Sequence, residues 1–137
     1  MSVHFDLTDN ELESQLANCL LDPIIFNHET HLRLAWIHIK KCGLEQAELN
    51  IHQQLQKFVE HLGATDKYHK TITIAAIRVV NHFMAKSKAF DFKTFIKEFP
   101  QLNTDFKSLI ESHYSFDIFS SKQARLEFLE PDLVDFN

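Results

Sequence analysis

Glycine and proline are scarce in this chain, with 2 glycines and 3 prolines among 137 residues. Soluble proteins contain roughly 7% glycine and 5% proline, and the tight turns of β-hairpins depend on both residue types. Because so few turn-forming residues are present, the sequence favours long helices over an all-β fold. We therefore predict an all-α fold, an irregular up-down bundle of about six to seven helices, in a single domain over residues 1–137.

Capping residues and apolar periodicity indicate where the helices begin and end. Thr8 and Glu11 have the spacing of a capping box, which predicts a first helix that ends ahead of Pro23. Asn27 has the position of an N-cap for a second helix, and Gly43 has that of its C-terminal signal. The later helices are expected over residues 28–42, 44–62, 65–86, 91–99, 104–114, and from 120 toward 131.

Charge and hydropathy restrict the partners and the compartment. The formal net charge is −5, which argues against nucleic acids and anionic membranes as partners because both bind clustered lysine and arginine. The sequence shows no export signal and no apolar run of about 18 to 20 residues, so we expect a cytoplasmic protein with no membrane partner. In that compartment Cys19 and Cys42 are expected to be thiols. A small-molecule ligand and the oligomeric state are left open.

The 9 histidines are the second unusual feature of the sequence. On a helical wheel at roughly 100° per residue, His28, His69 and His113 each lie at the end of an apolar stripe, on different predicted helices. The alternating helix directions of an up-down bundle are expected to bring these ends together. His31 lies one turn from His28 and is a fourth candidate. Three other histidines are expected elsewhere: His4 in an unpacked terminus, and His61 and His82 on outward helix faces.

Converging imidazoles predict a transition-metal site, because neutral imidazole is a good ligand for such ions. We predict a transition-metal-binding helical protein for Zn, Fe, Cu, Ni or Mn, with ligands His28, His31, His69 and His113. Three neighbouring side chains are candidate catalytic groups for proton transfer: Glu29, Tyr68 and Tyr114. A small-molecule metalloenzyme is one form of this function, and whether the chain is an enzyme stays open.

Three alternatives need no metal. Two helix N-termini flanked by His31, Lys67 and Tyr68 would suit the phosphate or carboxylate of a small molecule, because helix N-termini carry a positive partial charge. The phenylalanine-rich segment 90–99 could instead dock a protein partner, which would make the chain an interaction module. Finally, each histidine could simply be a buried residue whose hydrogen bonds are satisfied.

Two sequence blocks resemble those of other proteins. Residues 26–36 read FNHETHLRLAW and residues 67–71 read KYHKT. In these blocks the chain resembles a set of small uncharacterised bacterial proteins that share the motifs F-x-H-x-x-H-L-R-x-A-W and K-Y-H-x-T. The resemblance implies that the residues around His28, His31 and His69 belong together, and it implies no reaction.

Overall fold

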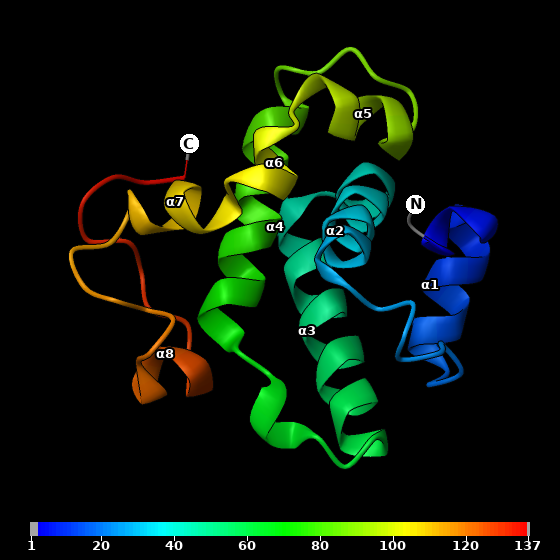
Figure 1. Ribbon diagram of the computed structural model, residues 1–137, viewed down its shortest axis with the longest axis horizontal. Coiled ribbons are helices and arrows are strands. Elements are labelled where there is room, and N and C mark those ends of the chain that lie inside the picture. Colours follow the sequence, from blue (N-terminus) through cyan, green and yellow to red (C-terminus); the bar gives the residue numbers. More distant parts are fainter. Residues whose placement is uncertain (1–2, 137) are drawn as a thin grey trace. The chain divides into compact units, whose positions relative to one another are not determined.

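The computed structural model describes residues 3–136, and this range is all-α, as the sequence predicts. Eight α-helices and two short 3₁₀ helices make up the regular structure of the described residues (Figure 1). Residues up to Tyr68 and residues from His69 onward form two compact units, which are described separately. Within the same range, no helix is both long enough and apolar enough to cross a membrane.

The first unit contains two 3₁₀ helices and three α-helices. Their bounds are η1 (Val3–Asp6), α1 (Asp9–Ala17), α2 (His28–Cys42), α3 (Leu44–His61) and η2 (Thr65–Lys67). In Figure 1 the blue α1 lies beside α2 and α3, and the three helices contact one another in pairs. The inner face of α3 is buried at helical spacing, through Ala47, Ile51, Leu55 and Phe58.

The ends of these helices confirm the predicted capping residues. The Thr8 hydroxyl accepts a hydrogen bond from the Glu11 amide at 3.1 Å, and the Glu11 carboxylate accepts one from the Thr8 amide at 2.9 Å. The Asn27 side chain caps α2 by accepting from the Thr30 amide at 2.9 Å. Gly43 alone separates α2 from α3, and its φ of 82° is strained for any residue with a Cβ atom.

The second unit is built on α4 (Lys70–Met84), much of which is buried. The other helices of this unit are α5 (Phe92–Glu98), α6 (Gln101–Thr104), α7 (Phe106–Glu111) and α8 (Lys122–Leu126). Both α7 and α8 pack against α4. In α5, Phe92 and Phe95 are buried, whereas Phe90 just before it is 90% exposed. The phenylalanine-rich segment therefore contributes mostly to the core.

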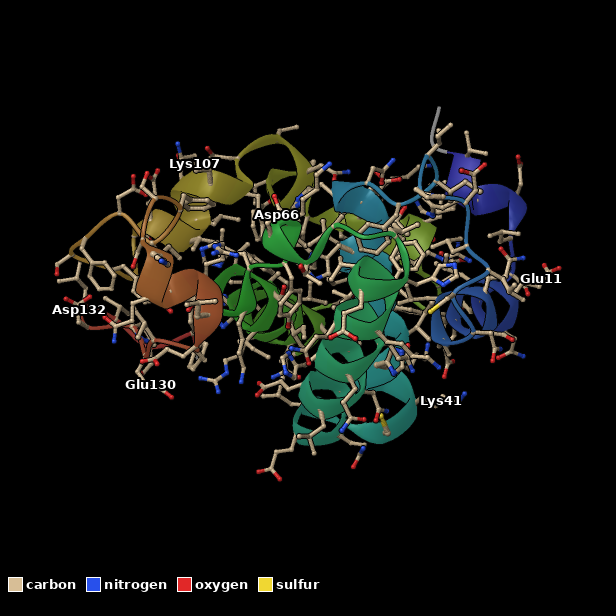
Figure 2. The ribbon with its side chains drawn as sticks, turned by 90° about the horizontal axis from the view of Figure 1, so that it is seen from below. Glu11, Lys41, Asp66, Lys107, Glu130 and Asp132 are labelled. Atoms are coloured by element: carbon tan, nitrogen blue, oxygen red, sulfur yellow. The ribbon has the colours of Figure 1, made fainter. Side chains whose placement is uncertain are left out.

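The second unit ends in a segment without helices, residues 127–136, which follows α8 and packs against α4 and the turn after α7. The buried Thr71 hydroxyl donates to the Glu127 carbonyl at 2.8 Å and accepts from the Leu129 amide at 3.1 Å. Tyr114 donates its hydroxyl proton to the Leu129 carbonyl at 2.7 Å. Figure 2 labels Glu130 and Asp132 on this red segment next to the orange α8. Side chains thus supply the hydrogen bonds that a regular helix would supply from its backbone.

Three predicted boundaries differ from the structure. The expected helix 104–114 is broken at Asp105, whose φ of −140° is not helical, so that α6 and α7 are separate. The last helix ends at Leu126, well before residue 131. The fourth helix starts at Lys70, because His69 itself is extended, with φ −126° and ψ 106°. In each case the change depends on a backbone conformation that apolar periodicity does not report.

Candidate functional site

The four predicted metal ligands divide between the two units. His28 and His31 belong to the first unit, and His69 and His113 belong to the second. His28 is the exposed first residue of α2. His31 lies one turn later, and its ring stacks on Phe26 with a centroid distance of 6.3 Å. The pair His28 and His31 therefore lies at the start of α2, as the helical spacing predicts.

His69 is the N-cap of α4 and uses both ring nitrogens. Its Nδ1 accepts a hydrogen bond from the Ile72 amide at 3.1 Å. The proton must then reside on Nε2, which donates to the Ile118 carbonyl at 2.8 Å. Burial lowers the pKa of His69, so the neutral ring that this bonding requires is favoured at neutral pH.

His113 follows α7 and holds the C-terminal segment. Its Nδ1 donates to the Val134 carbonyl at 2.7 Å, and its own carbonyl accepts from the Leu133 amide at 3.1 Å. The imidazole also packs on Phe136 with a centroid distance of 4.3 Å. His113 therefore joins the end of α7 to the last described residues of the chain.

The predicted transition-metal function is wrong. Within residues 3–136, no group of three or more histidine, cysteine, aspartate or glutamate side chains is arranged to hold a metal ion. A metal ligand needs a nitrogen with a lone pair to give, but both nitrogens of His69 are already hydrogen-bonded to the protein backbone. The proposed set His28, His31, His69 and His113 is thus not a metal centre.

The three candidate catalytic residues make contacts that fix local structure. Glu29 accepts a hydrogen bond from His4 Nε2 at 2.7 Å. The Tyr68 hydroxyl and His52 Nδ1 are hydrogen-bonded at 2.5 Å. Tyr114 donates to a carbonyl of the C-terminal segment, and burial raises its pKa to about 12. A proton-transfer role for Glu29, Tyr68 and Tyr114 stays a prediction.

A buried cluster around Arg33 was not expected from the sequence. His4 is completely buried, rather than unpacked, and its Nδ1 faces the Arg33 guanidinium at 3.1 Å. Arg33 also donates to the carbonyls of His4 and Leu7, at 2.6 and 2.8 Å, and to Asp9 at 2.8 Å. The guanidinium thereby attaches η1 to α2. The sequence offered one signal, because an arginine inside the otherwise apolar run 32–37 needs partners when it is buried.

Two histidines of α2 have buried ring nitrogens without hydrogen bonds among the described residues. These are Nε2 of His31 and both nitrogens of His38. Burial lowers the pKa of both rings, to about 4 for His31, where the neighbouring His28 adds to the effect. Both side chains are therefore neutral at pH 7, and they act as polar groups that the first unit buries at a cost.

The second unit contains a pocket of about 180 Å³. Its walls come from α4, from α7 with the turn after it, and from the C-terminal segment. The lining residues are Val79, His82, Phe83, Leu109, Ser112, His113, Val134, Asp135 and Phe136. Most of this lining is apolar, with the polar groups contributed by two histidines, one serine and one aspartate. Such a combination is typical of small-molecule sites, in which an apolar wall gives affinity and few polar groups give orientation.

The pocket has two neighbouring imidazoles, those of His82 and His113. The pKa of His82 is lowered by burial, and further by its electrostatic interactions with Lys86 and His113. His82 is therefore neutral at pH 7, with one donor and one acceptor nitrogen. His113 was predicted as a metal ligand, whereas His82 was assigned to an outward face. The spacing of Val79, His82 and Phe83 on one side of α4 is the sequence signal that could have placed His82 here.

No family model, no curated protein and no solved structure matches the chain.

Proposed function

We propose that the second unit binds a small organic molecule in the pocket between α4, α7 and the C-terminal segment. The observation that carries this proposal is the meeting of His82, His113 and apolar side chains in one cavity of about 180 Å³. An apolar protein cavity of about 150 Å³ is large enough for benzene. A ligand with roughly the size of a single aromatic ring therefore fits the volume.

A titration of the full chain followed by NMR tests this function. The probes are benzyl alcohol, benzylamine and benzoate, which share one ring and differ in charge. We expect saturable shifts of the amide signals of residues 79–83, 109–113 and 134–136 for at least one probe, with a Kd of about 1 mM for so small a ligand. Shifts that are absent, or that do not saturate, would contradict the proposal.

A pair of serine variants provides the matched control. Ser112 lines the pocket, and Ser108 lies one turn earlier on α7 outside the lining; both side chains are exposed. Ser112→Leu fills part of the cavity and should abolish the shifts, whereas Ser108→Leu adds the same bulk and should preserve them. Equal binding by the two variants would show that the probes bind elsewhere and would overturn the proposal.

A further inference from the structure

The polar lining of the pocket consists mainly of hydrogen-bond acceptors. In the neutral His113 ring, Nδ1 carries the proton that it donates to the Val134 carbonyl at 2.7 Å, so Nε2 is an acceptor. The Ser112 hydroxyl donates its proton to the Leu109 carbonyl at 2.8 Å, so that its oxygen lone pairs can accept a further hydrogen bond. The Asp135 carboxylate can only accept. Three lining groups can therefore accept hydrogen bonds from a ligand that carries hydrogen-bond donors.

The apolar lining also favours a positive charge. Phe83 and Phe136 contribute aromatic rings to the walls, and the faces of such rings attract cations. The structure already shows this attraction, because the Lys86 ammonium lies 5.9 Å from the centroid of the Phe83 ring. Lys86 is exposed and is not among the lining residues, so solvent screens part of its repulsion of a cationic ligand.

The net charge of the whole protein also favours a cationic ligand. The chain has a net charge of −5 with histidine counted as neutral, which raises the local concentration of cations around the protein. Asp135 is the one acidic residue of the pocket lining, and it is exposed. An ammonium group placed next to Asp135 would keep part of its hydration while it donates to the acceptors.

We infer that the pocket takes a small organic cation, a primary ammonium group on a compact apolar body. The ammonium donates toward Asp135, His113 Nε2 and Ser112, and the apolar body packs against the aromatic side chains. A primary ammonium offers three donors, one for each of these three groups. This inference depends on the proposed small-molecule site and names the chemical class of its ligand.

The same three probes test the ligand class in a way that separates it from the proposed function. Benzylamine, as its ammonium ion, should bind about tenfold more tightly than benzyl alcohol, which is the gain expected from one charge-assisted hydrogen bond. Benzoate should bind most weakly. If benzyl alcohol or benzoate binds as tightly as benzylamine, the cation preference is wrong and the pocket stands as a small-molecule site. If no probe binds, both proposals are wrong.

An aspartate variant and its control identify the charge responsible. Asp135→Asn keeps the shape of the side chain and removes its charge, so it should weaken benzylamine about tenfold and leave benzyl alcohol unchanged. Glu111→Gln removes one negative charge from an exposed residue at the end of α7 outside the lining. It should alter neither affinity. Equal losses in the two variants would show a long-range effect of net charge and would overturn the assignment to Asp135.

Discussion

The imidazole of His69 donates a hydrogen bond to the carbonyl of Ile118, 49 residues later in the chain, at 2.8 Å. The opposite nitrogen of the same ring accepts from the Ile72 amide and caps α4. One neutral side chain therefore starts the central helix of the second unit and holds the loop before α8. Its function is structural, which explains why a histidine at the end of an apolar stripe is not a metal ligand here.

Removal of the His69 ring should destabilise the second unit. His69→Ala loses the helix cap and the bond to Ile118, and we expect the free energy of unfolding to fall by about 2 kcal/mol. His69→Asn can still cap the helix but cannot reach Ile118, so it should lose about half as much. Urea denaturation followed by circular dichroism measures both values. A loss for His69→Ala no larger than that for His61→Ala, an exposed position on α3, would contradict this role.

Sequence patterns between near neighbours predicted the first helix correctly, but they could not predict contacts between residues far apart in the chain. The capping box of Thr8 and Glu11 needs only residues three apart, and the structure confirms it. The apolar periodicity predicts His69 inside the helix, whereas in the structure it is the extended residue before the helix. His4 was assigned to an unpacked terminus because its partners, Glu29 and Arg33, lie 25 and 29 residues away.

The pocket could not be predicted from sequence patterns either, because part of its wall comes from the C-terminal segment. Residues 127–136 have no helical periodicity, and they are positioned by single side chains of α4 and of the turn after α7. Three of the nine lining residues, Val134, Asp135 and Phe136, come from this segment. Helical periodicity singled out His113 as a metal ligand and gave no sign of this pocket, because its walls depend on tertiary contacts that periodicity does not encode.

Arg33 should be the most sensitive residue of the N-terminal attachment. Arg33→Met removes the donor to the carbonyls of His4 and Leu7 and the charge opposite Asp9. We expect a loss of about 3 kcal/mol in unfolding free energy, since partners of a buried charge are left unpaired. Hydrogen exchange should speed up at the Leu7 amide, which is bonded to the His4 carbonyl.

The matched control for Arg33 is a surface ion pair of the same unit. Lys41 and Glu13 are 3.0 Å apart, and the Lys41 side chain is 60% exposed. Lys41→Met should cost at most about 0.5 kcal/mol, as is usual for exposed pairs. If Arg33→Met costs no more than Lys41→Met, or if exchange at Leu7 is unchanged, the guanidinium does not hold η1 in place.

Buried neutral histidines should make the first unit sensitive to acid. The folded pKa of His31 is about 4, below the ordinary value of 6.5. The unfolded chain therefore binds a proton first, so that the stabilisation is complete above pH 6.5 and is lost as the pH falls from 6.5 toward 4. Between pH 7 and pH 5, His31 should account for a decrease of about 1 to 2 kcal/mol in unfolding free energy.

Urea denaturation of wild type and His31→Gln at several pH values measures this contribution. Glutamine does not titrate, so the stability of the variant should decrease less between pH 7 and pH 5. The comparison at pH 8, where His31 is neutral in both states, gives the cost of the substitution itself. Parallel pH profiles for the two proteins would show that His31 is not responsible for the acid sensitivity.

Two neighbouring threonines of α4 test how the C-terminal segment is held. Thr71 bonds to Glu127 and Leu129, whereas Thr73, also buried, donates to the His69 carbonyl within its own helix at 2.7 Å. Valine has nearly the same shape, so Thr71→Val should cost about 1 to 2 kcal/mol by leaving its partners unpaired. Thr73→Val should change the free energy of unfolding little, because the His69 carbonyl still accepts a hydrogen bond from the Thr73 amide after the hydroxyl is removed. Exchange of the Leu129 amide should speed up in Thr71→Val alone; equal exchange in both variants would mean that other contacts, such as that of Tyr114, suffice to hold the segment.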